Sequence, residues 1–365
     1  MSLNCGIVGL PNVGKSTLFN ALTNTQAAEA ANYPFCTISP NTGIVNIIDK
    51  RLDTLAELNK SEKTLYAKLE IVDIAGLVKG AHSGEGLGNQ FLHNIREVNA
   101  IIHVLRCFED ESIVHVNNSI NPLADAEIVN LELVIADLDV LEKRVLNIKK
   151  KKGKSSEEHY IELINSKLIP ALRDGVSVRD IQLTEEEQQL TNSLQLLSNK
   201  PIMYVCNVEE DNINTGNNHS KKVLEWCMKN NTPCINVSAQ IEQEISTLSN
   251  ANERNEYMEA LGITETGLDK IITQGYKLLK LQHYFTAGPK EARAWQIKKN
   301  DTAVEAARVI HNDFARGFIC AEIISYNDYI NTKSYNAAKE KGLVQQCGKN
   351  HTVQDGDVIL FRFNV

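Results

Sequence analysis

The chain has 365 residues, of which 42 % are hydrophobic and 23 % charged, and its formal net charge is −8. This length exceeds what one hydrophobic core usually supports, so we expect two or three domains. No run approaches the roughly 20 apolar residues of a membrane span. The first ten residues lack the features of a secretion signal. We therefore expect a cytoplasmic protein. Its negative charge argues against general polyanion binding, so no DNA partner is expected, although a local basic patch stays possible.

The eight cysteines form neither a C-x-x-C pair nor a cluster with histidine in the sequence. This pattern excludes a zinc finger and a disulfide framework, so free thiols are expected. The cysteines are at positions 5, 36, 107, 206, 227, 234, 320 and 347.

Short apolar strands alternate with helical stretches through much of the chain. This alternation predicts an α/β fold with a mostly parallel, doubly wound sheet. Strands are expected at residues 5–10, 43–48, 69–74, 100–107, 202–207 and 234–237, and a helix is expected at 15–22 directly after the first strand.

The segment from 122 to 199 interrupts this alternation. Apolar residues recur there every three or four positions between charged residues, which predicts an antiparallel helical hairpin with a coiled-coil seam. The lysines at 149–152 and 154 mark its tip, either as a solvated turn or as a binding site. The seam residues are Ile128, Leu131, Ile135, Leu138, Leu141, Val145 and Ile148 on the first helix, and Ile161, Ile164, Leu168 and Leu172 on the second.

A small α+β module is expected at the C-terminus. Strands are predicted at 294–297, 318–324 and 358–365, and Asp301 and Thr302 indicate a helix start. The predicted division is therefore a nucleotide-binding domain at 1–121 and 200–283, the helical insertion at 122–199, and the C-terminal domain at 284–365.

Residues 9–17, GLPNVGKST, match the phosphate-binding pattern G-x-x-x-x-G-K-[ST] between a strand and a helix. Glycines allow backbone N–H groups to turn toward phosphate oxygens, and the helix N-terminus favours an anion. Lys15 is expected to reach the β and γ phosphates, and the Ser16 hydroxyl to bind Mg²⁺. The chain is thus predicted to be a P-loop nucleoside triphosphatase.

A D-x-x-G motif, Asp73 to Gly76, follows the strand at 69–74. In P-loop switches this aspartate holds Mg²⁺, usually through water, and the glycine N–H senses the γ-phosphate. Thr37, in the loop NYPFCTI, is placed to give Mg²⁺ a second hydroxyl. The predicted metal ligands are Ser16, Thr37 and Asp73.

Leu77 stands where Ras-like switches carry the glutamine that orients water. Because leucine cannot orient water, hydrolysis must use another group. Two candidates are a K⁺ ion near Asn12 and the side chain of His115, for which a plain surface histidine is the competing interpretation. The predicted catalytic residues are Lys15, Gly76 and His115.

The motif Asn207-Val208-Glu209-Glu210 occupies the place of the guanine-reading N-K-x-D. It lacks the lysine, and Glu210 is one methylene longer than aspartate. Adenine offers N7 and N6–H₂, which the Asn207 amide can satisfy, so ATP is favoured. The predicted nucleotide-binding residues are Asn12, Val13, Gly14, Lys15, Ser16, Thr17, Asn207, Val208, Glu210, Ser238 and Ala239.

With these motifs in view, the chain resembles the Obg-related YchF family of ATPases over essentially its whole length. The resemblance rests on GLPNVGKSTLFNALT, NYPFCTI, DIAGLVKGA with GEGLGNQFL, NVEE, GYKLLKLQHYFTAG and DGDVILFRFNV. It implies a G-type domain, a helical hairpin insertion and a C-terminal β-grasp domain of the TGS type. It also implies a preference for ATP, a hydrophobic residue in place of the catalytic glutamine, and association with ribosomes.

Three functions are compatible with these features. The first is a slow, monomeric, Mg²⁺-dependent ATPase that acts as a switch on the translation machinery. The second is an Obg-type GTPase, against which the NVEE motif argues. The third is an ATP-gated binding protein whose hydrolysis is incidental, which Leu77 keeps open.

Overall fold

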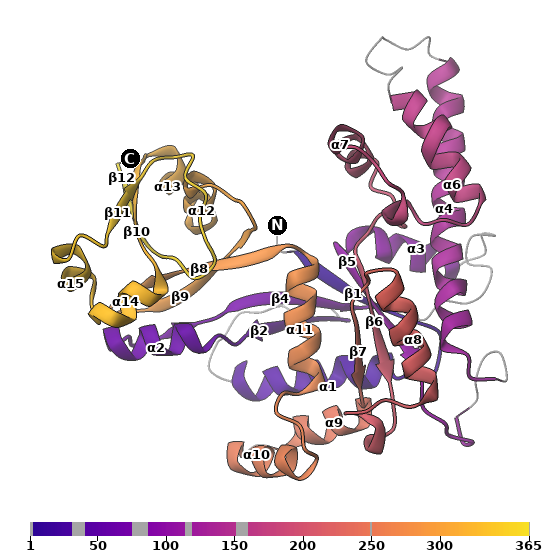
Figure 1. Ribbon diagram of the computed structural model, residues 1–365, viewed down its shortest axis with the longest axis horizontal. Helices are drawn as coiled ribbons and strands as arrows, with labels where there is room; N and C mark the ends of the chain where they lie inside the picture. Colours follow the sequence, from indigo (N-terminus) through magenta and orange to yellow (C-terminus); the bar gives the residue numbers. More distant parts are fainter. Residues whose placement is uncertain are drawn as a thin grey trace. The chain divides into compact units, whose positions relative to one another are not determined.

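The computed structural model describes residues 3–30, 41–74, 87–113, 119–150, 160–248 and 250–364. The chain divides into two compact units, one of residues 1–43 and 70–275 and the other of 44–69 and 276–365. The C-terminal segment of the second unit runs from orange to yellow in Figure 1. Within the described part of the chain, no helix combines the length and the apolarity that a bilayer span requires.

The first sheet has six strands in the order β2-β4-β1-β5-β6-β7. The pairings β1–β4, β1–β5, β5–β6 and β6–β7 are all parallel. Every residue of β5 and β6 is buried, as expected for parallel strands that are covered on both faces. The strands span Asn4–Val8 (β1), Thr42–Ile47 (β2), Ala67–Asp73 (β4), Ala100–Arg106 (β5), Ile202–Asn207 (β6) and Cys234–Val237 (β7).

Helices connect the strands of this sheet, and α1 packs against α9 (Figure 1). Asn217 caps α8 by accepting hydrogen bonds from the backbone N–H groups of His219 and Ser220. The helices are α1 (Lys15–Ala30), α3 (Leu87–Glu97), α8 (Asn218–Lys229), α9 (Ala239–Thr247), α10 (Ala251–Ala260) and α11 (Gly267–Leu278), with a 3₁₀ turn η4 (Glu210–Asn212). The predicted α/β fold with a P-loop domain is confirmed.

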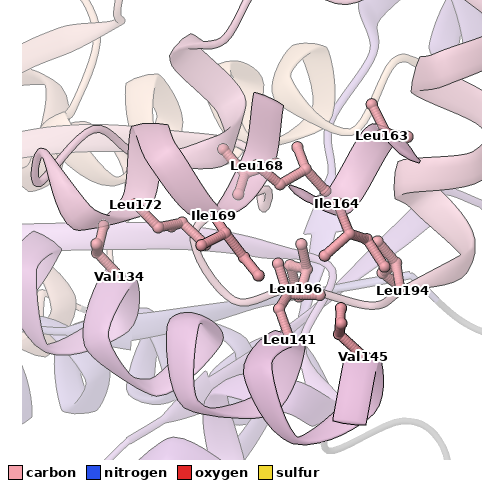
Figure 2. Close-up of a cluster of buried hydrophobic side chains, with 11 residues drawn as sticks. Val134, Leu141, Val145, Leu163, Ile164, Leu168, Ile169, Leu172, Leu194 and Leu196 are labelled. Carbon is pink, nitrogen blue, oxygen red and sulfur yellow. The ribbon is translucent and has the colours of Figure 1, made fainter. Parts of the chain in front are cut away.

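The insertion is a helical hairpin, as the sequence predicts. Its first arm is α4 (Pro122–Lys150), and residues 160–163, the π-helix η2 (Ile164–Leu168) and α6 (Ile169–Arg173) form the returning arm. Figure 2 shows Leu141 and Val145 of α4 facing apolar side chains of that arm. A 3₁₀ turn η3 (Val178–Asp180) and α7 (Glu185–Ser193) follow, and Leu194 and Leu196 complete the cluster.

One part of the predicted seam is wrong. Leu131 is 49 % exposed, whereas Leu133 and Val134 beside it are buried. The spacing of apolar residues in the sequence predicts a single buried stripe along this helix. In the structure, however, α4 also packs against β5 and α8. The buried face of this helix therefore includes positions that a two-helix seam would leave out.

The second unit contains a mixed sheet in the order β11-β10-β12-β8-β9-β3. The pairs β10–β11, β10–β12 and β8–β9 are antiparallel, while β12–β8 and β3–β9 are parallel. The strands span Thr64–Leu65 (β3), Leu281–Ala287 (β8), Ala292–Lys298 (β9), Phe318–Ile324 (β10), Gln345–Cys347 (β11) and Val358–Phe363 (β12). The helices are α2 (Lys50–Asn59), α12 (Ala303–Ile310), α13 (Asn312–Arg316), α14 (Tyr326–Thr332) and α15 (Tyr335–Glu340). The α+β module that the sequence predicts is confirmed.

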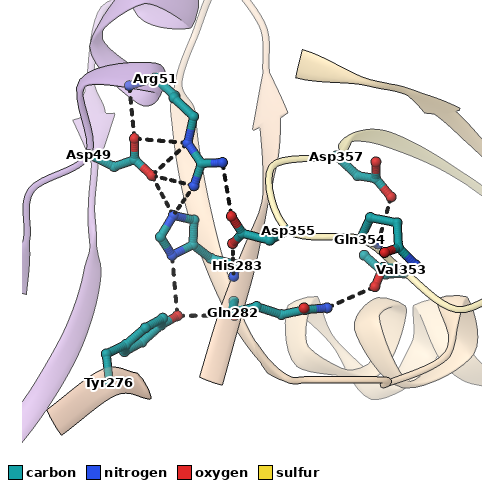
Figure 3. A network of polar contacts seen from close by, with 9 residues as sticks. All are labelled: Asp49, Arg51, Tyr276, Gln282, His283, Val353, Gln354, Asp355 and Asp357. Carbon is teal, nitrogen blue, oxygen red and sulfur yellow. Dashed lines mark hydrogen bonds and ion pairs between the residues drawn. The ribbon is translucent and has the colours of Figure 1, made fainter. Parts of the chain in front are cut away.

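A network of charged and polar side chains lies in the second unit (Figure 3). Asp49 caps α2 and accepts hydrogen bonds from the Arg51 guanidinium, at 2.8 Å to Oδ2, while its Oδ2 is 2.6 Å from Nε2 of His283. Arg51 also donates to Asp355 at 2.9 Å, and Nδ1 of His283 is 3.3 Å from the Tyr276 hydroxyl. Burial alone would raise the pKa of Asp49, but the hydrogen bonds from His283 and Arg51 outweigh it and hold this pKa well below its usual range.

The segment at 44–69 packs with residues far away in the sequence. The sequence-based division places it in the nucleotide-binding domain, whereas it lies in the same compact unit as residues 276–365. The division between the units falls within β2, β4 and α11. The domain boundaries drawn from the sequence stay a prediction.

Candidate nucleotide site

The loop between β1 and α1 has the backbone that a phosphate-binding turn needs. Gly9, Asn12 and Gly14 have φ values of 157°, 63° and 97°. A side chain at Gly9 would place its Cβ 2.5 Å from the carbonyl oxygen of Val104, and one at Gly14 would overlap the side-chain nitrogen of Asn207. Both glycines are therefore required by conformation and by space.

Lys15 is the first residue of α1 and is only 7 % exposed. Its ammonium group donates to the carbonyl oxygen of Leu10 at 2.7 Å. Burial lowers the pKa of Lys15 to about 8, against the opposing effect of the Asp73 charge. A cation held in this partly desolvated position gains strongly from a polyanionic ligand.

Asp73 ends β4 beside the phosphate loop. The Ser16 hydroxyl donates to its Oδ2 at 3.4 Å, while its Oδ1 is buried and has no hydrogen-bond partner among the described residues. Burial raises the pKa of Asp73, although the Lys15 charge and the Ser16 hydroxyl oppose this.

A hydroxyl and an unsatisfied carboxylate oxygen are ligands that Mg²⁺ prefers, so these residues fit the predicted ion. Among the described residues, no group of three or more His, Cys, Asp or Glu side chains is able to hold a metal. A cation at this site would therefore take further ligands from nucleotide phosphates or water.

The side chain of Asn207 connects the phosphate loop to the start of α9. Its Nδ2 donates to the Val13 carbonyl at 3.0 Å, and its Oδ1 accepts from the Ala239 N–H at 2.9 Å. Ser238, the residue before α9, is 2 % exposed, and Asn207 is 5 % exposed. Predicted residues from three separate segments are thus brought together.

These two bonds bear on the predicted reading of adenine. Oδ1 and one Nδ2 hydrogen of Asn207 are already engaged, so a two-bond contact with adenine would require at least one bond to change. The predicted adenine contact of Asn207 stays a prediction. Val208 is 2 % exposed, and Glu210 lies on the exposed turn η4.

The sequence did not single out Glu209, the third residue of the base motif. Its Oε1 accepts from the backbone N–H of Glu109 at 2.8 Å, and its Oε2 accepts from Asn212 and Asn217. This carboxylate joins the loop after β5 to the loop after β6. Its position between two motif residues was the only signal in the sequence.

Arg106, the last residue of β5, fixes the same loop after β5. Its guanidinium donates to the carbonyl oxygens of Phe108, Asp110 and Ile113, at 3.3, 3.0 and 2.9 Å. The Arg106 side chain is almost fully buried. The hydrogen bonds to these carbonyl oxygens offset the cost of burying its charge.

Several predicted site residues lie outside the described residues. These are Thr37, Gly76, Leu77 and His115, together with the lysines at 151, 152 and 154. The positions of Lys149 and Lys150 are described only as the end of α4. Their predicted roles stay predictions.

Comparison with known proteins agrees with this geometry. Residues 4–136 match the family described as a 50S ribosome-binding GTPase, and residues 281–364 match the YchF-GTPase C-terminal family, described as a protein of unknown function. The ribosome-binding ATPase YchF of Haemophilus influenzae is 50 % identical over 366 residues, covering 100 % of both chains. The chain belongs to the YchF family. The resemblance predicted from the motifs is thereby confirmed.

Other YchF proteins extend the match. The ribosome-binding ATPase YchF of Bacillus subtilis is 49 % identical over 368 residues, again covering 100 % of both chains. A solved structure of the Schizosaccharomyces pombe YchF GTPase is 35 % identical, with a TM-score of 0.90 over 99 % of this chain and 98 % of that one. The names of these proteins differ in the nucleotide, ATP for the bacterial proteins and GTP for the yeast structure.

Proposed function

We propose that this chain binds and hydrolyses ATP with Mg²⁺ and acts as a nucleotide-controlled, ribosome-binding switch. The observation that carries the proposal is the arrangement of Lys15, Ser16 and Asp73 around the glycine-bounded loop, with one carboxylate oxygen left unsatisfied. The relatives that are 49–50 % identical over the full length are named ribosome-binding ATPases.

Each described residue has a defined task in this proposal. Lys15 neutralises charge on the β and γ phosphates, and the backbone N–H groups of the loop orient them. Ser16 and Asp73 would hold Mg²⁺ together with the phosphates, Asp73 through water, and Thr37 is the predicted further ligand. The bound ion would offset negative charge on the phosphate oxygens. Gly76 is the predicted sensor of the γ-phosphate.

The base is held on the side formed by Asn207, Ser238 and Ala239. Asn207 fixes the relative position of the phosphate loop and the first turn of α9 through its two hydrogen bonds. The absence of the N-K-x-D lysine and the outward position of Glu210 support ATP over GTP. The name of the yeast structure, a YchF GTPase, supports the GTP alternative.

The identity of the group that orients water stays a proposal with two candidates. One is His115, and the other is a K⁺ ion near Asn12. Replacement of K⁺ by Na⁺ slows the enzyme if the ion acts, whereas His115→Ala slows it if the histidine acts.

Single-turnover hydrolysis with ATP and with GTP, each in the presence and absence of ribosomes, tests the function. We expect ATP to be hydrolysed faster than GTP and ribosomes to accelerate ATP hydrolysis. Equal rates for the two nucleotides would favour a nucleotide-tolerant GTPase-like enzyme. Ribosomes that bind the ATP form without changing its hydrolysis would instead favour the ATP-gated binding protein.

Glu210→Asp is the sharper variant for testing base choice. Asn207→Asp would remove the Nδ2 donor to Val13 and so disturb the phosphate loop, whereas Glu210 is exposed. A shift toward GTP in Glu210→Asp supports side-chain reading at this position. An unchanged ATP preference would assign the choice to backbone groups.

A further inference from the structure

Glu242 is a fully buried carboxylate on α9, and nothing in its sequence context distinguishes it. Its Oε1 accepts from the backbone N–H of Gly267 at 2.7 Å, and its Oε2 accepts from that of Leu268 at 3.3 Å. These are among the N–H groups at the start of α11 that have no partner within the helix. A carboxylate at this place also interacts favourably with the helix dipole.

Gly267 is required for this contact. A Cβ on this residue would lie 2.7 Å from Cγ1 of Val237 and 2.8 Å from Oε1 of Glu242. The start of α11 therefore lies directly against α9 and the end of β7. There is no room for a side chain between them.

Buried hydrogen bonds lead from Glu242 to the phosphate loop. The Glu242 N–H donates to the Ser238 carbonyl at 3.0 Å, in the first turn of α9. The next residue, Ala239, donates its N–H to Asn207, whose amide donates to Val13. The phosphate loop, the base side and the start of α11 are thus joined within the first unit.

We propose that Glu242 is a positioning residue for the nucleotide site, which ties the base-side turn of α9 to the start of α11. The effect of Glu242 on nucleotide affinity rests on the proposed ATP binding. The contact of Glu242 with the N–H groups of Gly267 and Leu268, which we call the tie, exists in the protein without nucleotide. Helix α11 is also the element within which the chain passes from the first unit to the second, after Gly275.

The tie is sensitive to pH in the neutral range. Burial raises the pKa of Glu242 to about 7, and the charge of Asp269 on α11 acts in the same direction. The N–H groups of Gly267 and Leu268 and the charge of Arg254 on α10 oppose this rise. Burial dominates because the ionised carboxylate is removed from water.

The sign of the effect follows from linkage. When the contact opens, Glu242 is hydrated and regains its ordinary pKa of 4.5. The closed state therefore binds the proton more tightly than the open state, so acid favours closure. Opening increases by up to about tenfold per pH unit between these two pKa values and levels off above the higher one.

Amide hydrogen exchange on the full chain without nucleotide tests the tie. After correction for intrinsic exchange rates, the amides of Gly267 and Leu268 should open about fortyfold more at pH 7 than at pH 5, given the pKa values of about 7 and 4.5 for the closed and open states. Glu242→Gln keeps the shape of the side chain but cannot ionise, so its profile should be flat. Glu256→Gln, which removes an exposed carboxylate from α10, should keep the wild-type profile. A wild-type profile as flat as that of Glu242→Gln would overturn the proposal.

ATP affinity tests the positioning role separately. The affinities of wild type and Glu242→Gln are compared as a ratio at each pH. Titration of Lys15 or of the nucleotide changes both affinities equally and therefore does not change this ratio. We expect equal affinities at pH 5 and a wild type that is about three- to tenfold weaker at pH 8, on the scale of tenfold for 1.4 kcal/mol. Equal affinities at both pH values would refute the positioning role. Failure of both proteins to bind ATP at any pH would refute the proposed function instead, and the exchange experiment would still decide the tie.

Discussion

Two aspartates beside basic side chains behave in opposite ways in this protein. In the second unit, Asp49 is satisfied by His283 and Arg51, and its pKa lies well below the usual range. In the first unit, Asp73 has Lys15 nearby, but one buried oxygen has no partner within the described ranges, and its pKa is raised. We assign the first carboxylate to the stability of the fold, and the second is the proposed ligand of Mg²⁺. The degree of hydrogen-bond satisfaction distinguishes these roles better than burial does.

The largest expected effect concerns the cation beside Asp73. Lys15→Ala should weaken ATP binding by at least about 100-fold, or roughly 2.7 kcal/mol, because the phosphates lose their buried counter-charge. Titration calorimetry measures this, and Lys222→Ala, which removes an exposed lysine of α8, is the matched control. Unchanged ATP affinity with a large loss of stability would show that Lys15 stabilises the fold. It would contradict the contrast between the ligand site at Asp73 and the stabilising network at Asp49.

The second prediction removes the satisfied carboxylate. Asp49→Asn should lower the free energy of unfolding of the second unit by about 2–3 kcal/mol, because Arg51 and His283 lose a largely buried partner. Urea unfolding followed by Trp295 fluorescence, in a Trp226→Phe background, reports on that unit. ATP affinity should not change.

Asp355→Asn is the control for Asp49→Asn. Asp355 contacts the same arginine, but its side chain is 47 % exposed against 14 % for Asp49. Its loss should be below about 1 kcal/mol. Equal losses for the two variants would contradict the assignment of Asp49 as the stabilising group.

The smallest expected effect sharpens the comparison with a third buried group. His103 on β5 is fully buried, and both ring nitrogens lack a hydrogen-bond partner in the part of the chain that the structure describes, yet it lies within a strand rather than at the phosphate loop. His103→Leu should raise the free energy of unfolding at pH 7 by about 1 kcal/mol, because no unsatisfied polar group is then buried. Nucleotide affinity should stay unchanged; a loss would show that His103 serves the site.

The same histidine predicts a pH dependence. Burial lowers the pKa of His103 from 6.5 to about 3, so the unfolded chain binds a proton that the folded chain does not. Wild-type stability should therefore fall as the pH decreases from 6.5 toward 3, by up to about 1.4 kcal/mol per pH unit. Urea unfolding at pH 5 and 7 should show a smaller decrease for His103→Leu. Identical decreases would exclude His103 as the source.

The sequence predicted those features that depend on neighbouring residues. The strands at 202–207, 234–237 and 318–324 have the predicted bounds, because each is a mainly apolar run. The phosphate loop is recognisable because its glycines and Lys15 lie within one stretch of nine residues, 9–17. The geometry around them, including the unsatisfied Asp73 oxygen, required the folded chain.

Features that depend on distant residues were missed. The short segment around Asp49 reads as part of the nucleotide-binding domain. Contacts across more than 200 positions, such as those of Asp49 with His283 and of Arg51 with Asp355, place it in the second unit. Glu242 looks like one of many helical glutamates. Its burial arises from the close approach of Gly267, which spacing within α9 cannot indicate.

Gly14 has a consequence for how mutants of this protein are interpreted. A methyl group there would occupy the space of the Asn207 amide, which accepts a hydrogen bond from the first residue of α9. Gly14→Ala therefore changes two functions with one atom, and a loss of activity in this variant cannot be attributed to phosphate contacts alone. Residues 14 and 207, distant in the sequence, form a single unit for mutagenesis: a smaller residue at 207 relieves the overlap, but a side chain at position 14 still has an unfavourable backbone conformation.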